Sequence, residues 1–444
     1  MRLAPAIVGH TEEVLREILR FTGPADGTLS RYFREHPRLG SRERGVIAEA
    51  IYGLLRNKSV YTSFSESGSG SQMRRLTLLG LADAVGIDAL GGLSEDEAVW
   101  LNRVMEIDRT HLPTTQQSNM PSWLWQKMLA RFGESAAMAL AQSLNTPAPL
   151  DLRVNALKAN RDDVIASLAQ APIVASPTPY SALGLRVIKK PSIQNLPLFK
   201  DGSIEVQDEG SQVLAQILGA KRGEMVADFC AGAGGKTLAL GAAMRNTGRL
   251  YAFDISEKRL AKLKPRLARS GLSNVHPVVI AHERDAKIKR LAGKLDRVLV
   301  DAPCSGLGTL RRNPDVKWRQ NLEGIAELNQ KQAAILDSAA RLVKFGGRLV
   351  YATCSILEEE NEGIVQQFLA AHADFELRPM SQILEEQKID LVMGDYLNLT
   401  PHQHQTDGFF AAVLQRKKEV KKELPTEAPL ETEVEADHNS GDAQ

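Results

Sequence analysis

The spacing of apolar residues predicts helices at the start of the chain. Between residues 11 and 22 the apolar positions share one helical face, with Thr11 as the expected N-cap and Gly23-Pro24 as the stop. The same spacing returns over 41–56, and a Gly/Ser-rich run separates it from further helical sequence. We therefore predict an all-helical domain over residues 1–118, which serves either as a plain scaffold or as an RNA-contacting module.

The pattern changes at about residue 119, where an amphipathic helix begins that runs to about Leu144. An alternating strand follows at 150–154, a short helix begins at Asn160, and further strands are expected at 185–187 and 204–206. Residues 119–208 are therefore predicted to form a small α/β subdomain of RRM-like type.

Beyond Met225 apolar runs and amphipathic helices alternate regularly. Strands are predicted at 225–229, 249–253, 275–280, 297–301 and 347–352, with helices at 236–245, 257–270 and 322–344. This alternation is typical of parallel strands with helices on both faces, so residues 209–416 are predicted to form a Rossmann-like, doubly wound α/β sheet. The polar segment 417–444 is predicted to be disordered.

Composition bears on the partners and the cellular location that we expect for the protein. The 444 residues carry a formal net charge of +1, which neither requires nor excludes a nucleic-acid partner. Cys230, Cys304 and Cys354 are far apart and form no C-x-x-C pair, so we expect neither a disulfide framework nor a metal site. The sequence shows no signal peptide and no run of ~20 apolar residues. We expect a cytoplasmic monomer that does not insert into a membrane.

A glycine-rich turn follows the apolar run 225–229 and precedes helical sequence. In such a unit glycines let the backbone approach a ligand, and the first turn of the helix offers free amides. The phosphate-binding Walker pattern fails because Cys230 stands where its first glycine belongs. The dinucleotide pattern fails because Thr237 replaces its third glycine.

The pattern that remains is D-x-x-x-G-x-G, formed by Asp228, Gly232 and Gly234. It is the signature of S-adenosylmethionine-dependent methyltransferases; the alternative is a tight turn without a ligand. Asp254 ends the next strand and is expected to accept the hydroxyls of a ribose. Asp285 follows the third strand, where it either contacts the adenine side of the cofactor or caps a helix.

Two cysteines follow strong apolar strands, in the runs 301–306 and 353–355. The carboxyl ends of parallel strands meet at one edge of the sheet, and neighbouring strands lie ~4.8 Å apart. In the strand order 3-2-1-4-5 these two strands are adjacent, so Cys304 and Cys354 can face one ligand. The alternative for each cysteine is ordinary packing, because free cysteine is often buried.

Two thiols and a carboxylate beside a methyl donor suit methylation of cytosine at carbon 5. A thiolate that adds to carbon 6 turns the ring into a nucleophilic enamine, which is covalent catalysis. Asp301 can hold the nitrogen and carbonyl edge of the ring. A second group can act as a base or assist release.

A basic loop follows the first cysteine and contains one tryptophan. Its residues are Arg311, Arg312, Lys317, Trp318 and Arg319. Such a mixture suits phosphate contact and base stacking, and the alternative is an ordinary solvated loop. A cytosine within a helix cannot reach a sheet-edge pocket, so the target is expected to be unpaired or flipped out.

These motifs resemble those of the RsmB/Sun-type RNA cytosine-5 methyltransferases of the NOL1/NOP2/Sun family. The similarity rests on D-F-C-A-G-A-G-G-K-T (228–237), D-A-P-C-S-G (301–306), R-R-N-P-D-V-K-W (311–318) and Y-A-T-C-S (351–355). It extends over residues 1 to about 416, and the order of the N-terminal helices resembles the NusB-type RNA-binding domain. The resemblance implies that the product is 5-methylcytosine in RNA, and small-subunit rRNA is the expected substrate.

The resemblance implies a role for each matching residue. Cys354 is implied to be the nucleophile and Cys304 to aid product release, while Asp301 holds the target ring and Lys236 lies near both base and cofactor. The residues implied to bind the cofactor are Cys230, Ala231, Gly232, Ala233, Gly234, Gly235, Lys236, Asp254, Asp285 and Asp301. The family often has Ala-Pro where this chain has Gly232-Ala233, and losing that proline loosens the turn by ~0.5–1 kcal/mol.

Other functions stay open at this point. A transfer-RNA methyltransferase would use the same residues, and a non-catalytic RNA-binding assembly factor could keep the fold. A DNA cytosine-5 methyltransferase is disfavoured, because those enzymes carry P-C-Q and E-N-V motifs, whereas Ser305 follows Pro303-Cys304 and no E-N-V occurs.

Overall fold

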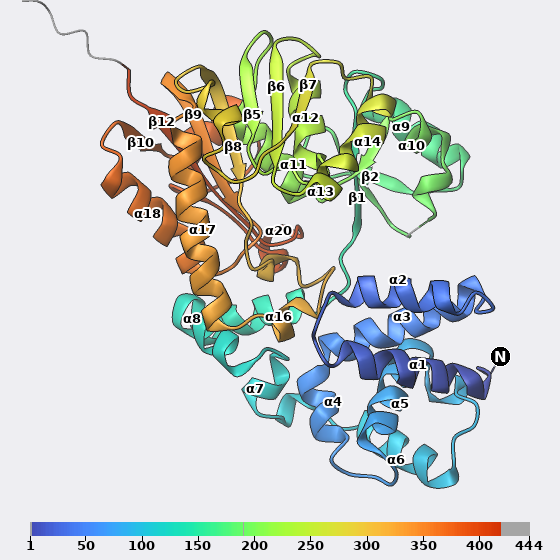
Figure 1. Cartoon of the computed structure of the whole chain (residues 1–444). Helices are drawn as coiled ribbons and strands as arrows, with labels where there is room; N and C mark the ends of the chain where they lie inside the picture. The colour runs from blue at the N-terminus through green and yellow to red at the C-terminus, as the bar shows by residue number, and fades with distance from the viewer. Residues whose placement is uncertain (1, 190, 419–444) are drawn as a thin grey trace, which may run out of the picture.

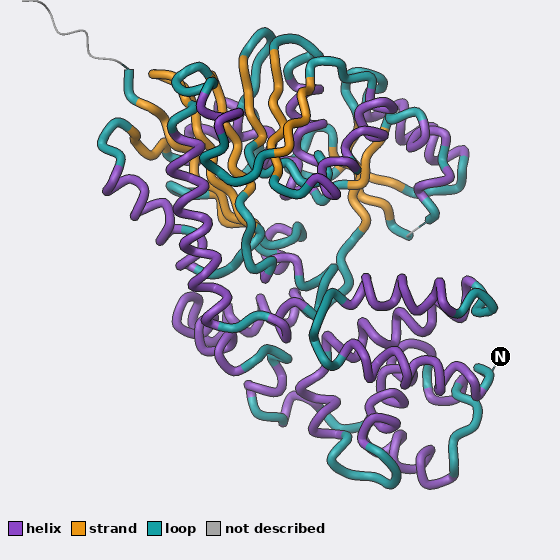
Figure 2. The backbone as a smooth tube through the Cα atoms, in the orientation of Figure 1, coloured by secondary structure: helices purple, strands orange, loops and turns teal. Residues whose placement is uncertain are grey.

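The computed structural model describes residues 2–189 and 191–418. A helical N-terminal region, a small antiparallel sheet and a large, mainly parallel sheet follow one another along the chain (Figure 1). The described strands lie in the two sheets, beyond the helical region (Figure 2). The predicted tail falls mostly on residues 419–444, which lie outside the described residues. Within the described residues, no helix combines the length and apolarity needed to cross a membrane.

Six helices of the N-terminal region share one apolar core, which confirms the helical prediction. They are α1 (Pro5–Ile18), α2 (Ala25–Glu35), α3 (Ser41–Arg56), α4 (Lys58–Phe64), α5 (Gln72–Val85) and α6 (Glu95–Met105), and the short helix α7 (Thr114–Gln117) follows them. The predicted N-cap is wrong, because Pro5 starts α1 and Thr11 lies inside it. There the buried Thr11 hydroxyl donates a hydrogen bond to the carbonyl of Ile7 at 2.7 Å.

Helix α8 (Ser122–Leu144) leads into a four-stranded antiparallel sheet of order β2-β3-β1-β4. Its elements are β1 (Leu150–Val154), α9 (Arg161–Gln170), β2 (Ala175–Pro177), β3 (Gly184–Val187), α10 (Pro197–Lys200) and β4 (Ile204–Val206). This agrees with the predicted small α/β arrangement. The apolar face of α8 packs against residues of the large-sheet region, among them Leu310 and Ile356.

The large sheet has the order β10-β12-β9-β8-β5-β6-β7, and β11 pairs with β12. Its strands are β5 (Met225–Asp228), β6 (Arg249–Asp254), β7 (Val275–Val279), β8 (Leu295–Asp301), β9 (Val343–Thr353), β10 (Phe375–Arg378), β11 (Leu397–Leu399) and β12 (Phe409–Arg416). Strands β7, β6, β5, β8 and β9 are parallel, in the predicted order 3-2-1-4-5. Strands β10, β11 and β12 add an antiparallel edge that was not predicted.

Helices cover both faces of the large sheet, as a doubly wound fold requires. One face packs against α17 and α18, and the other packs against α11, α12 and α19. The helices of this part are α11 (Glu209–Leu218), α12 (Gly235–Ala243), α13 (Glu257–Ala261), α14 (Leu263–Ser270), α15 (Ala286–Lys289), α16 (Val316–Arg319), α17 (Leu322–Ala340), α18 (Glu362–Ala371), α19 (Met380–Gln387) and α20 (Pro401–His404).

Candidate active site

The glycine turn after β5 has the backbone shape that its sequence predicts. Gly232 and Gly234 adopt positive φ angles of 56° and 83°, and α12 begins at Gly235. A Cβ at Gly234 would lie 2.2 Å from Leu263 Cδ1, so a side chain cannot fit there. At Gly232, by contrast, a Cβ would meet nothing within 4 Å. The turn therefore presents its backbone to open space at Gly232.

Two carboxylates border this cradle. Asp254 Oδ2 accepts a hydrogen bond from the Gly232 amide at 2.7 Å, which joins the end of β6 to the turn. Asp228 Oδ2 accepts one from Thr237 Oγ1 at 2.7 Å, while its Oδ1 is buried without a partner. Burial raises the pKa of Asp228 to about 7. Acceptors beside an open glycine fit a ligand with hydroxyl and ammonium donors, which S-adenosylmethionine has.

The turn also contains Cys230, Ala231 and Ala233, and Gly235 is the first residue of α12. The Cys230 side chain packs against the core of the large sheet, and burial raises the pKa of its thiol well above the usual value. Asp285 acts as the N-cap of α15, accepting from the amides of Ala281 and Lys287 at 2.8 Å each. Asp285 therefore caps a helix, which is one of its two predicted roles, and contact of Asp285 with the cofactor stays a prediction.

The two cysteines converge at the ends of adjacent parallel strands. Asp301 at the end of β8 stands opposite Ala352 of β9, and the turns that follow carry Cys304 and Cys354. The two Sγ atoms are 3.2 Å apart, and both residues are half-buried. The Cys354 amide also donates to Cys304 Sγ at 3.3 Å. The hydrogen bond with Cys354, followed by burial, raises the pKa of Cys304 well above its usual value.

A half-buried ion pair links the cradle helix to the cysteine turn. Lys236 Nζ, at the start of α12, donates to Asp301 Oδ2 at 2.7 Å and lies 5.8 Å from the ring centroid of Phe409. Burial lowers the pKa of Lys236, but the charge and hydrogen bond of Asp301 outweigh it and leave the pKa raised. A charge on Cys354 contributes further to raising this pKa.

The first two arginines of the predicted basic loop pair with acids, and Arg311 is buried. Arg311 is 6% exposed and donates to Asp407 Oδ1 at 3.0 Å. Arg312 donates to the same carboxylate and, at 2.9 Å, to Asp208. The expected phosphate contact of Arg311 is wrong, because its guanidinium is buried and paired with Asp407. Arg312 pairs with the same acid but is half-buried, and its phosphate contact stays a prediction.

The other loop residues hold the helical region against the large sheet. Lys317 is fully buried and donates to Asn145 Oδ1 and to the carbonyl of Arg56. Trp318 packs on the helical core, and its Nε1 donates to the carbonyl of Leu55 at 2.8 Å. The expected phosphate contact of Lys317 is wrong because the side chain is buried. The indole of Trp318, which was expected to stack on bases, packs on the helical core instead. These contacts fasten the segment after β8 to the helical region (Figure 1).

Two residues that support the site were not predicted. Arg266 donates to the carbonyl of Ala233 at 2.6 Å and pairs with Glu205 at 2.9 Å, so it holds the turn that lacks the family's proline. Nothing in the local sequence indicates this contact. Glu360 is fully buried behind the cysteine turns. The acidic run that follows Cys354 contains it and could have indicated a buried acceptor.

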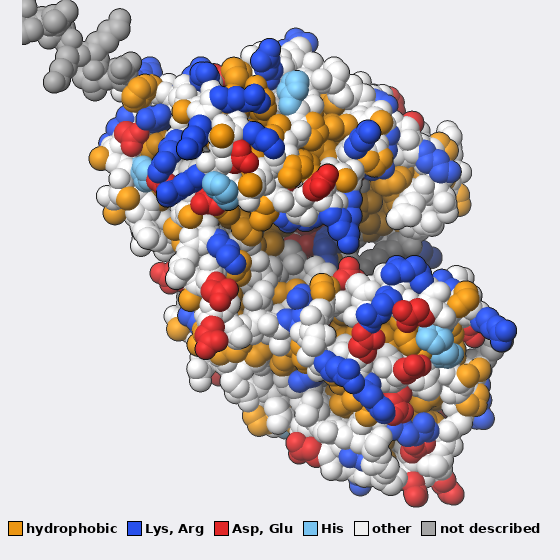
Figure 3. Space-filling view, in the orientation of Figure 1, with side chains coloured by type: hydrophobic (Ala, Val, Ile, Leu, Met, Phe, Trp, Pro, Cys, Tyr) orange, Lys and Arg blue, Asp and Glu red, His pale blue; other side chains and the backbone are white. Residues whose placement is uncertain are grey.

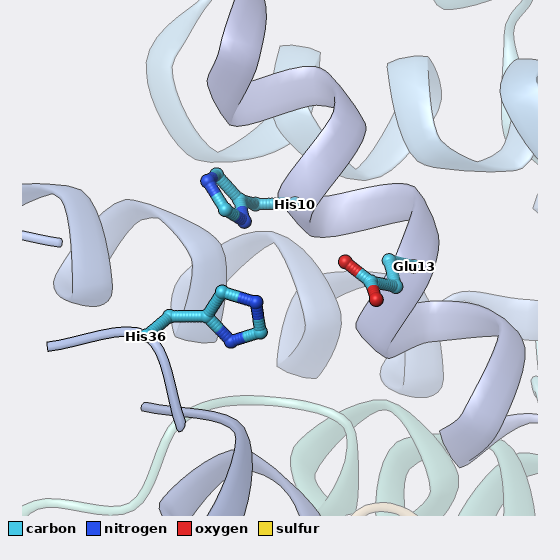
Figure 4. Close-up of side chains that lie close together, drawn as sticks. All are labelled: His10, Glu13 and His36. Carbon is cyan, nitrogen blue, oxygen red and sulfur yellow. The ribbon is translucent and has the colours of Figure 1, made fainter. Parts of the chain in front are cut away.

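A group of potential metal ligands lies in the helical region, away from this site. His10 and Glu13 of α1 and His36 after α2 point toward one another (Figure 4). The Tyr32 hydroxyl lies between His10 and Glu13, at 2.8 Å and 2.7 Å, and the Tyr32 carbonyl bonds to His36. Since Tyr32 already satisfies these groups, we assign no metal to them.

Sequence comparisons agree with this geometry. Residues 215–415 match the family described as 16S rRNA methyltransferase RsmB/F, and residues 120–194 match the ferredoxin-like domain of RsmF/B-like methyltransferases. The probable ribosomal RNA small subunit methyltransferase B of Synechocystis sp. is 33% identical over 437 residues, which cover 91% of this chain and 98% of that protein. The Bacillus subtilis protein of the same description is 30% identical, over 85% of this chain and 92% of its own length.

Solved structures agree as well. The crystal structure of PH0851 covers 94% of this chain and 100% of its own, with a TM-score of 0.73 and 26% identity. A methyltransferase homolog protein from Pyrococcus horikoshii covers 70% of this chain and 100% of its own, with a TM-score of 0.59 and 30% identity. The matches agree with S-adenosylmethionine as the predicted methyl donor. The chain belongs to the RsmB/F family of rRNA methyltransferases.

Proposed function

We propose that this protein transfers a methyl group from S-adenosylmethionine to carbon 5 of a cytosine in small-subunit (16S) rRNA, through a covalent adduct with Cys354. The observation that carries the proposal is the 3.2 Å separation of the two sulfurs. Two half-buried thiols that meet beside a cofactor cradle suit an addition–elimination reaction on a pyrimidine ring. Methylation of an oxygen or of an exocyclic amine needs no such pair.

Cys354 acts as the nucleophile. Its sulfur forms a bond to carbon 6, and the electron pair of the carbon 5–carbon 6 double bond becomes available at carbon 5. The bound cofactor supplies an electrophilic methyl group on a sulfonium. Lys236, which Asp301 holds at the start of α12, supplies a positive charge to the site.

Asp301 and Cys304 serve the remaining steps. Asp301 keeps about a third of its side chain exposed despite the ion pair with Lys236, so it can accept a hydrogen bond from the cytosine edge. After methyl transfer a base, either a group of the site or water, takes the hydrogen at carbon 5 as a proton. The carbon–hydrogen electron pair re-forms the double bond between carbon 5 and carbon 6, and the sulfur–carbon pair leaves with Cys354. Cys304 lies next to that sulfur and assists this release.

The RNA is expected to present an unpaired or flipped-out cytosine. On the face shown in Figure 3 the surface is hollowed between the helical region and the sheet-bearing part of the chain, and side chains of both charges border the hollow. The segment after β8 connects the cysteine turn with the helical region. This arrangement suits an RNA that contacts both parts while one base enters the site.

Bisulfite sequencing of total RNA from cells with and without the gene tests the proposal. We expect loss of methylation at cytosine in 16S rRNA, restored by the wild-type protein and not by Cys354→Ala. Loss confined to transfer RNA would indicate the tRNA alternative. An unchanged map in both RNA classes would contradict an enzymatic role and favour a non-catalytic RNA-binding factor.

A further inference from the structure

A buried carboxylate lies directly behind the two cysteine turns. Glu360 ends a short 3-10 turn, Glu358–Glu360, that follows Cys354. Its exposure is 0%, and no ion pair with it is found among residues 2–189 and 191–418. A buried carboxylate without a cation is costly unless hydrogen-bond donors surround it. The donors around Glu360 therefore indicate what this charge holds in place.

Four donors meet the carboxylate of Glu360. Oε1 accepts from the amide of Ser305 at 2.8 Å and from Gln332 Nε2 at 3.0 Å. Oε2 accepts from the hydroxyl of Ser305 at 2.5 Å and from the hydroxyl of Ser355. Since an ionised carboxylate offers about four lone-pair sites, this set occupies them fully.

The two serines are the residues that directly follow the two cysteines. Ser305 follows Cys304, and Ser355 follows Cys354, so one carboxylate ties both turns together. Each serine hydroxyl also accepts a backbone amide two residues later, from Leu307 at 3.4 Å and from Leu357 at 3.1 Å. The hydroxyls thus connect the backbone of each turn to the shared acid.

We propose that Glu360 is a positioning residue that fixes the two sulfurs relative to each other. If the proposed function holds, on which this inference rests, Glu360 thereby determines how fast the covalent adduct is released. Only an acceptor can serve the two hydroxyls, the amide and Gln332 at once. The position also has an electrostatic consequence: after the hydrogen bond with Cys354 and burial, the charge of Glu360 helps to raise the pKa of Cys304 and keep it a thiol.

The first test is Glu360→Gln in the full-length protein, with Glu359→Gln as the matched control. Glu359 lies in the same turn but pairs with Lys127 at 2.7 Å. We expect Glu360→Gln to lower kcat about 10- to 100-fold, as small misplacements of reacting groups do, with KM for cofactor and RNA unchanged. We also expect covalent adduct to accumulate on denaturing gels, whereas Glu359→Gln should match the wild type.

The second test separates the two turns and avoids the risk that Glu360→Gln fails to fold. Ser305→Ala loosens the turn of Cys304, so adduct should form normally and persist. Ser355→Ala loosens the turn of Cys354, so adduct should form slowly without persisting. A merely structural role would lower the melting temperature and slow both steps alike, and that result would overturn the inference.

A third readout does not depend on methyl transfer. Diamide oxidises neighbouring thiols to a disulfide with loss of two hydrogens, and intact-protein mass spectrometry follows this rate. We expect Ser305→Ala and Ser355→Ala, which both keep the charge of Glu360, to slow the crosslinking of Cys304 to Cys354 at least several-fold. If these variants crosslink as fast as the wild type and form as much adduct, the positioning role would be overturned. Absence of any wild-type adduct, with slowed crosslinking in the variants, would contradict only the proposed function.

Discussion

Lys236 Nζ lies 2.7 Å from Asp301 Oδ2, and this pair joins the cofactor cradle to the strand that carries the first cysteine. Lys236 comes from the start of α12 and Asp301 from the end of β8, 65 residues apart in sequence. The Lys236 ammonium therefore lies between the cofactor cradle and the part of the site that is proposed to hold the cytosine.

Lys236→Met should lower the single-turnover rate about 100-fold, since it removes a preorganised positive charge and leaves the Asp301 carboxylate unpaired. The rate is measured with labelled cofactor at saturating RNA. Lys344→Met is the control, because it breaks an ion pair between Lys344, at the beginning of β9, and Asp296, at the beginning of β8. A Lys236→Met enzyme as fast as the control would contradict the role of the ammonium.

Asp228 should make stability fall as pH rises. Its folded-state pKa of about 7 lies above the usual 3.8, so between these values the folded protein binds a proton that the unfolded chain has lost. This contribution is complete below the unfolded value and disappears as pH passes the folded value. In Asp228→Asn the decrease in unfolding free energy between pH 4 and pH 7 should be about 2–4 kcal/mol smaller than in the wild type. Parallel urea titrations at several pH values measure it; equal slopes would contradict the prediction.

Arg311 should matter for stability and not for RNA affinity. Arg311→Gln removes one of the two arginines that pair with the buried Asp407 and should cost about 3–5 kcal/mol of unfolding free energy. A phosphate contact would instead change the salt dependence of RNA binding by about one unit of slope. Denaturant melts and filter binding across salt concentrations separate the two. A normal melt with a smaller salt slope would restore the RNA-contact interpretation.

The sequence predicted the parallel sheet because its strands are short apolar runs that end at glycine turns or acids. Asp228, Asp254, Cys304 and Cys354 each follow such a run, so their place at one sheet edge followed from strand order alone. The antiparallel edge formed by β10 and β12 was not predicted, since pairing of β12 with β9 depends on contacts between distant segments.

Charge composition misled the interpretation of the loop after Cys304. Arg311 and Arg312 are basic residues in a polar stretch, and composition alone cannot distinguish a solvated arginine from a paired one. Their partner Asp407 lies 96 and 95 residues away, and Lys317 enters an apolar junction with the helical region. Glu360 was missed for a related reason, because its partners come from separate turns.

Covalent trapping of RNA by two cysteine variants tests the central claim most directly. The purified wild type, Cys304→Ala and Cys354→Ala proteins are incubated with cofactor and a 16S rRNA fragment, and adducts are resolved on denaturing gels. The account predicts a stable adduct with Cys304→Ala, because release is slowed, and neither adduct nor methylation with Cys354→Ala. An adduct that persists with Cys354→Ala, or methylation of the RNA by Cys354→Ala, would contradict the account.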